Sequence, residues 1–394
     1  MKKANKIESL TNSLKLINKN INPNENEIDD DVATDFDKAR ECARKIRIEL
    51  TKKYPKYKIT LNLTGGTKIM ACAFWLEFYG HPIIYTDTQY NCFRFLNSGK
   101  SDQMDLKNLS IKNLLKFNNY KIQSVASDND IWKDRCSQRI HLTLWLAKQN
   151  KDIISQLNIL INDIENQAIK KFGDNKWNSI IQNPFIKNSI DLSTFPSSVK
   201  INEKLEDKLI KSNLVNKNSH KKLSVTSIVA IRYLSGGWLE ELAWLLAKEC
   251  GADECLANVK LKTASNKTNT NAQQTENEID LIVRYQAKMM IVECKTISWS
   301  KEKGKQDIFN KLTTLGTYAS GRLFGKTVLL TTHPVKASIN DPDRWQRLID
   351  IYRIKLISIN NSRDRIWNVD VPKLWNILCE FTNQSMKILP KDIY

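Results

Sequence analysis

The sequence predicts an α/β protein with a sheet near each end and a mainly helical middle. Near the amino terminus, an alternating β-prone segment over residues 58–64 precedes two glycines, and an apolar helical segment over 68–79 follows them. Near the carboxy terminus, β-prone segments over 277–285 and 288–294 flank a tight turn and predict an antiparallel hairpin. The segment between, residues 106–225, is Lys/Asn-rich with helical periodicity.

The amino-terminal domain is expected over residues 1–105. Helices are predicted over 1–20 and 35–53, ahead of the β-prone segment. Further strands are predicted over 82–86 and 91–97. A strand, a glycine turn, a helix and a second strand in this order form a βαβ unit, which implies a parallel sheet. The helix over 68–79 is apolar on most faces, so we expect it to be buried.

The carboxy-terminal domain is expected over residues 226–394, with residues 106–225 as a helical connector. An amphipathic helix over 237–249 precedes the predicted hairpin, and the polar segment 263–276 lies between them as a loop. The remaining predicted elements are a helix near 305–318, strands over 326–332 and 353–359, and a last helix over about 371–386. This order of elements predicts an α/β core.

The charge and cysteine content restrict the classes of partner and cofactor. A net charge of +18 favours a polyanionic partner such as nucleic acid, although excess lysine also serves solubility. Eight cysteines without a CxxC pair, and only four histidines, exclude zinc ribbons and zinc fingers. No apolar segment is long enough for a signal peptide or a membrane span, so we expect a cytoplasmic protein that does not contact membranes.

The predicted hairpin contains the most informative polar residues. Strand side chains alternate between faces, so Glu293 and Lys295 share one face, and Asp280 on the paired strand comes alongside Glu293. Two such carboxylates repel each other, and a divalent cation relieves that repulsion. Mg²⁺ or Mn²⁺ suits an all-oxygen site, where it would activate water for attack on a phosphodiester. The alternative is a surface hairpin with an ordinary salt bridge.

The helix before the hairpin supplies a further acid. Glu240 is the expected metal ligand, together with Asp280 and Glu293. Its neighbour Glu241 is the alternative, because adjacent helical residues point about 100° apart. Glu278 shares a strand face with Asp280 and offers an additional ligand. Lys295 is expected to orient the attacking water or to stabilise charge on the phosphate oxygens.

The glycine turn of the amino-terminal domain is the second candidate site. A helix amino terminus that follows glycines and carries threonine hydroxyls favours phosphate binding. The spacing is not that of a Walker motif, and a tight turn with a capping threonine explains it equally well. The turn consists of Thr64, Gly65, Gly66, Thr67 and Lys68.

The order of acid-bearing helix, Asp strand and Glu-x-Lys strand resembles the PD-(D/E)xK nuclease superfamily. The resemblance spans residues 235–332, with Ile279 in place of the usual proline before the aspartate. It implies a nuclease acting on DNA, RNA or both. The residues it implies to be catalytic are Glu240, Asp280, Glu293 and Lys295.

The segment from Asn62 to Met70 resembles the signature of CARF domains, the Rossmann-like sensors of type III CRISPR-Cas systems. Together with the nuclease motifs, the resemblance covers residues 55–97 and 226–360 and extends to CARF-containing CRISPR ancillary nucleases. Such proteins bind cyclic oligoadenylate at a homodimer interface, and we expect cyclic tetra-adenylate to be the activator here. The resemblance implies that the ligand contacts Asn62, Thr64, Gly65, Gly66, Thr67 and Lys68.

The chain departs from this family in one respect. CARF sensors begin with a strand, a ligand-contacting loop and a helix before the signature strand. About 57 residues precede that strand here, and none of them predicts a first strand, so we expect an amino-terminally shortened sensor. A constitutive DNA-repair or restriction nuclease and a non-catalytic nucleotide-binding regulator are the competing interpretations.

Overall fold

The structure is a computed structural model whose described residues form two compact units, Met1–Leu109 and Ser110–Tyr394. Each unit is considered by itself. The described residues are 30–87, 90, 92–103, 109–118, 120–182, 191–263, 276–296, 302–318, 325–333, 344–351, 354–358 and 369–384. The helix predicted over 1–20 and most of the loop predicted over 263–276 lie outside them.

The amino-terminal unit contains a four-stranded sheet in the order β1-β2-β3-β4. Strands β1 and β2 are parallel and joined through α3, which confirms the predicted βαβ unit. Strands β3 and β4 add an antiparallel hairpin, of which only β3 was predicted. The elements are η1 (Asp30–Ala33), α2 (Phe36–Lys53), β1 (Leu61–Asn62), α3 (Lys68–Glu77), β2 (Ile83–Asp87), β3 (Cys92–Phe95) and β4 (Lys100–Gln103).

Helices α2 and α3 are joined by a charged cluster and a small apolar core. The carboxylate of Glu77 on α3 pairs with Arg40 at 2.8 Å and with Arg44 at 3.3 Å, both on α2. These guanidinium groups lower the pKa of Glu77, Arg44 having the larger effect. Ala39 and Ala73 pack against each other's helices beneath this cluster.

Helix α3 is not the buried helix that its composition predicted. Ala73 is its one buried residue among the described side chains, while Ile69, Leu76 and the following Tyr79 are exposed. Three apolar side chains at positions i, i+7 and i+10 lie on one side of a helix. Helix α3 therefore presents an apolar face that nothing in the described part of the chain covers.

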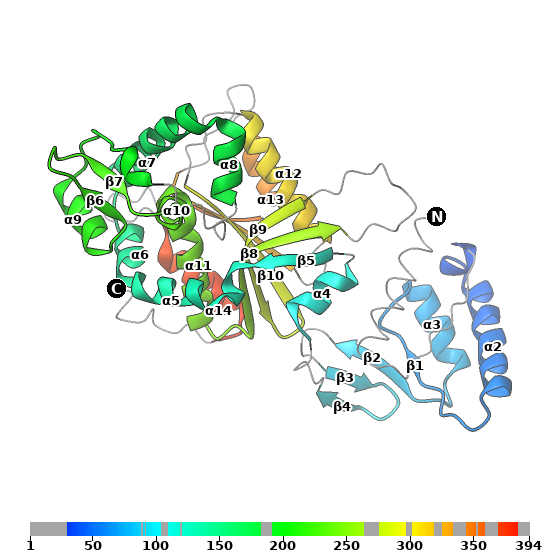
Figure 1. The fold of residues 1–394 in the computed structure, drawn as a ribbon. Coiled ribbons are helices and arrows are strands. Elements are labelled where there is room, and N and C mark those ends of the chain that lie inside the picture. The colour runs from blue at the N-terminus through cyan, green and yellow to red at the C-terminus, as the bar shows by residue number, and fades with distance from the viewer. Residues whose placement is uncertain are drawn as a thin grey trace. The chain divides into compact units, whose positions relative to one another are not determined.

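The carboxy-terminal unit is built on a six-stranded sheet in the order β12-β11-β10-β9-β8-β5 (Figure 1). Strands β10, β11 and β12 are parallel, and β9, β8 and β5 continue the sheet in antiparallel fashion. The hairpin of β9 and β10 confirms the sequence prediction. The strands are β5 (Tyr120–Val125), β8 (Glu254–Thr263), β9 (Glu276–Tyr285), β10 (Lys288–Lys295), β11 (Gly325–Thr331) and β12 (Ile354–Ile357).

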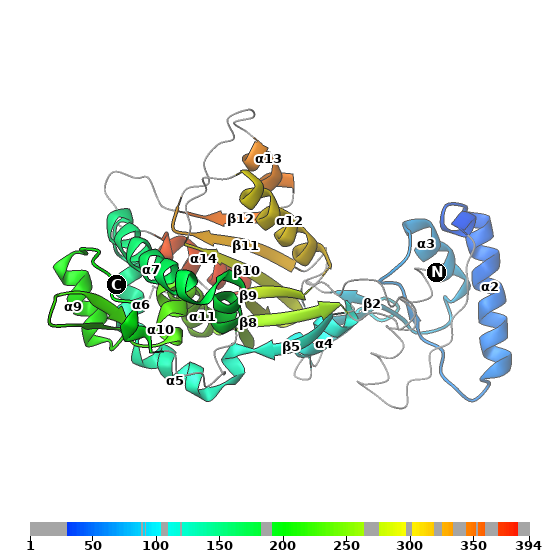
Figure 2. The same ribbon diagram turned by 45° about the horizontal axis from the view of Figure 1, so that its top comes forward.

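Helices cover both faces of this sheet (Figure 2). The larger apolar core packs α11 and α14 against one face, and two smaller cores pack α4, α12 and α13 against the other. The helices are α4 (Ile111–Phe117), α5 (Asp130–Gln138), α6 (Ile140–Ala147), α7 (Lys151–Phe172), α8 (Asp174–Gln182), α9 (Glu203–Lys211), α10 (Ile228–Arg232), α11 (Trp238–Glu249), α12 (Glu302–Tyr318), α13 (Arg344–Ile351) and α14 (Val371–Phe381). Short turns η2 (Ala126–Asp128), η3 (Leu192–Thr194) and η4 (Tyr233–Gly237) and a small ribbon of β6 (Val215–Lys217) and β7 (Leu223–Val225) complete the unit. No described helix is long and apolar enough to cross a membrane.

The segment 106–225 is not a separate connector between two domains. It is mainly helical, as expected, but its strand β5 pairs with β8 at the edge of the large sheet. Its helices after α4 share the main apolar core with α11 and α14. This arrangement could not be predicted from the sequence, because β5 is short and its partner lies far along the chain.

A buried ion pair joins this helical segment to α11. The guanidinium of Arg139, between α5 and α6, donates two hydrogen bonds to the carboxylate of Glu241, one of them at 2.9 Å. The two side chains are only 10% and 4% exposed. The guanidinium also lies 4.2 Å from the ring centroid of Tyr233, whose hydroxyl forms a 2.9 Å hydrogen bond with Thr143.

We expect Arg139→Leu to lower the free energy of unfolding of the carboxy-terminal unit by about 3–5 kcal/mol, because Glu241 would remain buried without a counter-charge. Urea unfolding followed by tryptophan fluorescence measures this. The double variant Arg139→Leu/Glu241→Leu should recover most of the loss, since it leaves no unpaired charge. A single variant as stable as the parent would contradict this role of the pair.

Candidate nuclease active site

The candidate site forms where β9 and β10 stop pairing. Their ladder ends at the pair Leu281–Val292, whereas β10 stays paired with β11 as far as Lys295. Beyond that last pair, the carboxylate of Asp280 accepts a hydrogen bond from the backbone N–H of Cys294 at 2.7 Å. The Asp280 side chain thus replaces a carbonyl group of the neighbouring strand as the hydrogen-bond acceptor. From this point β9 and β10 diverge, and the place where they separate is the fork between the two strands.

A local reversal of strands β8 and β9 accompanies the fork. Ala257 and Leu281 face the core beneath α11, while Val259 and Ile279 face the core on the opposite side of the sheet. Residues two apart in a regular strand share a face, so the strands reverse between these pairs. Asn258 lies at the reversal with a φ of +51°, a left-handed conformation that asparagine tolerates.

One side of the fork is a compact group of carboxylates and lysines. The ammonium of Lys295 lies 2.7 Å from Glu293 Oε1, 3.4 Å from Asp280 Oδ2 and 3.0 Å from the carbonyl oxygen of Cys294. Lys311 on α12 donates to both oxygens of Glu293, at 2.7 and 2.8 Å. Burial and Asp280 raise the pKa of Glu293, and the two lysines offset part of that rise. Burial opposes the charge on Lys295, but Asp280 and Glu293 outweigh it and raise the pKa of this lysine.

The other side of the fork is formed by helix α11. Burial, with a contribution from Asp280, raises the pKa of Glu240 to about 8, while a hydrogen bond from Asn258 lowers it. The adjacent Glu241 points elsewhere, into its ion pair with Arg139. Geometry therefore favours Glu240 over Glu241 as the helix acid of the site.

The start of α11 is fixed by two glycines. Helix α10 passes through the turn η4 into α11, and Gly236 has a φ of +146°. A Cβ at this residue would come 3.0 Å from the hydroxyl of Thr296, directly after β10, and a Cβ at Gly237 would come 2.9 Å from a backbone oxygen. The glycines thus allow the helix carrying Glu240 to approach the end of β10.

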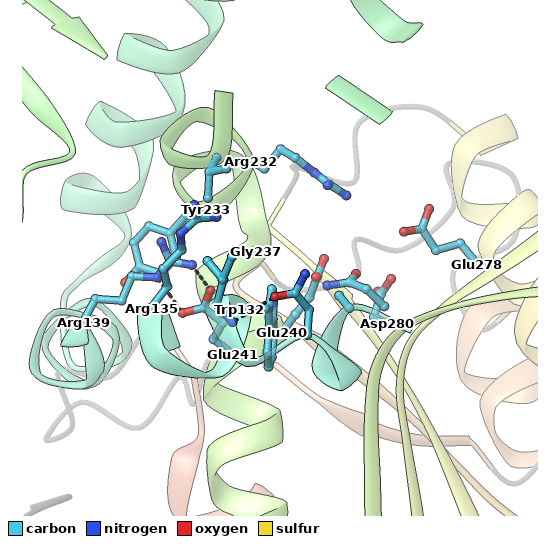
Figure 3. A pocket seen from close by; sticks show the side chains of 15 residues that line it. Trp132, Arg135, Arg139, Arg232, Tyr233, Gly237, Glu240, Glu241, Glu278 and Asp280 are labelled. Carbon is cyan, nitrogen blue, oxygen red and sulfur yellow. Dashed lines mark hydrogen bonds and ion pairs between the residues drawn. The ribbon is translucent and has the colours of Figure 1, made fainter. Parts of the chain in front are cut away.

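A pocket of about 310 Å³ opens beside α11 (Figure 3). Its walls come from η2, α5, α10, η4, α11, β8 and β9. Among the acids named from the sequence, Glu240, Asp280, Glu278 and Glu241 line it. Glu293 and Lys295 are not among the lining residues, and Glu293 is bonded to Lys311 of α12. Asp280 is the residue that borders both the pocket and the lysine group.

The structure does not gather all three expected metal ligands into one ready cluster. Within the part of the chain that is described, no three His, Cys, Asp or Glu side chains are grouped so as to hold a metal ion. Glu240 and Asp280 act on each other electrostatically, as do Asp280 and Glu293. The donor set is nevertheless all oxygen and partly buried, which is the chemistry that a hard divalent cation requires.

Sequence reasoning missed the site roles of two residues. Asn258 bonds Glu240, but nothing in the sequence marked strand β8, because the reversal at this residue interrupts its alternation. No motif singled out Lys311, and only the packing of α12 on the sheet brings it to Glu293.

The glycine turn of the amino-terminal unit is well formed. The side chain of Asn62 accepts hydrogen bonds from the backbone N–H and the hydroxyl of Thr64, and that hydroxyl accepts one from Thr86 N–H on β2 at 2.7 Å. Thr67 caps α3 through Met70 N–H at 3.2 Å. These three polar side chains therefore stabilise the turn itself.

The remaining turn residues are exposed. Gly66 has a φ of +85°, which favours glycine, and a Cβ on Gly65 would meet no atom within 4 Å. Lys68 is exposed, and within the described residues its side chain makes no hydrogen bond or ion pair. The backbone of the two glycines and the lysine are accessible to a ligand.

Fold and site together define a nuclease that carries a Rossmann-like regulatory domain. A family described as "Card1 CARF domain" matches residues 1–114, and one described as "Card1-like, endonuclease domain" matches residues 228–357. The chain belongs to the CARF-domain nucleases of type III CRISPR-Cas systems, with the sensor domain first and the endonuclease domain second. This confirms the resemblance to CARF-containing nucleases found in the sequence.

Solved structures share the fold. Can2 from Sulfobacillus thermosulfidooxidans, in complex with cyclic tetra-adenylate, aligns with a TM-score of 0.60 and 18% identity over 97% of this chain and 90% of its own. Protein VC1899 from Vibrio cholerae aligns with a TM-score of 0.66 and 15% identity over 96% of this chain and 88% of its own. Among curated proteins, none matches the sequence.

The raised pKa of Glu240 predicts how the metal-free protein responds to pH. Its folded-state value of about 8 lies above the ordinary 4.5, so between these values the folded protein keeps a proton that the unfolded chain has released. Stability should therefore fall as pH rises, by up to about 1.4 kcal/mol per pH unit. Urea unfolding in EDTA at pH 5.5 and 7.5 measures this, and Glu240→Gln should lose less stability over that range. Equal losses in parent and variant would contradict the assignment.

Proposed function

We propose that this protein is a metal-dependent endonuclease that cuts DNA, RNA or both and is activated by cyclic oligoadenylate. The observation that carries the proposal is the fork between β9 and β10, where three oxygens surround the Lys295 ammonium within 3.4 Å. A position where several oxygens converge on one cationic group also suits a divalent cation.

Mg²⁺ or Mn²⁺ is the cofactor proposed for this position. Asp280 and Glu293 would hold it, with the carbonyl of Cys294 as a further oxygen and Glu240 approaching from the pocket side. When bound, the cation polarises the phosphodiester and lowers the pKa of a water molecule. This set of ligands is the one expected from the PD-(D/E)xK arrangement that the sequence resembles.

The two lysines have separate tasks in this proposal. In the metal-free protein, Lys295 and Lys311 neutralise the buried Glu293, which would otherwise be costly to ionise. When substrate is bound, Lys295 is the group that stabilises negative charge developing on the phosphate oxygens. Lys311 favours the ionised form of Glu293 through its two short hydrogen bonds.

The amino-terminal domain is the proposed sensor. Can2, which shares this fold, is described with cyclic tetra-adenylate bound. In this chain the exposed backbone of Gly65 and Gly66, the amino terminus of α3 and the exposed Lys68 offer N–H groups and positive charge to phosphates. Asn62, Thr64 and Thr67 hold the turn in shape for that contact.

The active assembly is proposed to be a homodimer. A ring of phosphates with internal symmetry is best bound by the same patch from two subunits related by a twofold axis. The uncovered apolar face of α3, which includes Ile69 and Leu76, begins at the glycine turn and supports a second copy of this chain as its partner.

Asp280→Asn and Glu293→Gln should each reduce cleavage more than about a hundredfold, because a lost metal ligand costs more than a lost supporting contact. Cleavage of single- and double-stranded DNA and RNA with Mn²⁺ and cyclic tetra-adenylate measures this. Glu380→Gln is the matched control, since this acid on the same unit is 69% exposed and pairs only with Lys326 among the described residues. Full activity in both site variants would exclude this active site.

Lys68→Ala should raise the cyclic tetra-adenylate concentration needed for half-activation by about tenfold, since it removes one charge-assisted phosphate contact. Any cleavage seen without the ligand should be unchanged. Lys45→Ala on α2 is the control, because Lys45 is exposed and paired with Glu41 at 2.8 Å. Sedimentation of protein and ligand should give one ligand per dimer. Cleavage by a protein that binds no ligand would contradict the sensor assignment and leave the nuclease assignment intact.

A further inference from the structure

Two arginines line the pocket opposite its carboxylates. Arg135 comes from α5 and Arg232 from the end of α10, and the proposed metal chemistry uses neither. In Figure 3 Arg135 lies across the pocket from Glu278 and Asp280, and the side chain of Arg232 extends over the pocket above Glu240. The pocket therefore has one cationic and one anionic wall.

These arginines differ from a structural arginine nearby. Arg139 also lines the pocket, but it is bonded to Glu241 and stacked on Tyr233. In the described part of the chain, the side chains of Arg135 and Arg232 make no hydrogen bond or ion pair. Each keeps all five guanidinium N–H donors available, in the planar arrangement that matches a phosphate.

The carboxylates of the anionic wall would repel a nucleic-acid substrate unless cationic side chains also contact it. Glu240, Glu278 and Asp280 line the pocket, and like charges repel a phosphodiester that approaches them. Arginines on the opposite wall supply the attraction that brings the backbone of a nucleic acid into such a pocket.

The two walls are held together by specific contacts. The hydroxyl of Ser127, directly before α5, accepts a hydrogen bond from the backbone N–H of Ala257 at 2.9 Å, next to Asn258 on β8. On α5 itself, Trp132 packs edge-on against Trp244 of α11 with ring centroids 5.0 Å apart. The helix carrying Arg135 is thus packed on α11, which carries Glu240, and the turn before it is bonded to β8, which pairs with the strand that carries Glu278 and Asp280.

Arg232 is positioned just as closely. A Cβ at Gly237 would come 2.9 Å from its carbonyl oxygen, so the turn η4 holds the end of α10 tightly against the start of α11, the helix that carries Glu240. Both arginines therefore lie on elements that pack directly on the acid-bearing helix.

We propose that Arg135 and Arg232 form a phosphate clamp that binds the nucleic-acid backbone beside the bond to be cut and presents that bond to Glu240 and Asp280. This role rests on the proposed nuclease function, for which it names the substrate-binding side chains. The clamp contacts phosphate and not base edges, so it adds affinity without sequence preference.

The test measures binding of a fluorescein-labelled 20-nucleotide single strand to the full chain by anisotropy, in an Asp280→Asn background and over a range of salt concentrations. Arg135→Gln and Arg232→Gln should each weaken binding about tenfold and reduce the salt slope by about one. Lys133→Gln is the matched control on α5, because Lys133 pairs with Asp130 at 3.0 Å and does not line the pocket. Its affinity should stay within about twofold of the parent.

Arginine-to-lysine variants at both positions separate a phosphate contact from a general effect on folding. Each keeps the charge, so each should restore the salt slope while recovering only part of the affinity. The clamp would be overturned if both glutamine variants kept the parent's affinity and salt slope while the protein that retains Asp280 cuts nucleic acid. The nuclease assignment would then still stand. Loss of binding in those variants, with no cleavage by the Asp280 form under any condition, would support the clamp and overturn the nuclease.

Discussion

The hydrogen bond from the Cys294 backbone to the Asp280 carboxylate is the contact on which the rest of the site depends. It replaces a strand-to-strand bond, and so it ends the pairing of β9 with β10 at the point where the acids are needed. A buried carboxylate at such a fork must find counter-charges, and Lys295 supplies the nearest one. Glu293, Lys311 and Glu240 are then arranged around a group that the sheet itself holds in place.

Two adjacent glutamates show how one helix serves both stability and chemistry. Successive residues of a helix point about 100° apart, so Glu240 reaches the pocket while Glu241 is directed to the buried Arg139. The second acid is neutralised, and it ties α11 to the helices that precede it. The first is buried beside Asp280, and both burial and that neighbouring carboxylate raise its pKa. Sequence alone left these two roles interchangeable.

What the sequence could predict was local. The hairpin of β9 and β10 is predicted by the alternation of side chains over a few residues and by a tight turn. The same pattern identified Asp280, Glu293 and Lys295 as site residues. Strand β8 was hidden because its alternation reverses at Asn258, and β5 because its partner is remote. For α3, apolar composition indicated burial, but composition does not say whether another part of the same chain covers a helix. The arginines of the pocket converge only through tertiary packing, which no spacing along the chain encodes.

The pairing of β5 with β8 also orders events during synthesis. β5 leaves the ribosome early, yet its partner appears only after residues 126–253 have been made. At roughly 5–20 residues per second, that delay is on the order of ten seconds. During this delay, β5 has been synthesised without the strand it pairs with. The helices that follow β5 have been synthesised before the sheet on which they pack. The carboxy-terminal unit therefore completes its folding late in translation, and the nuclease stays inactive until most of the polypeptide has emerged.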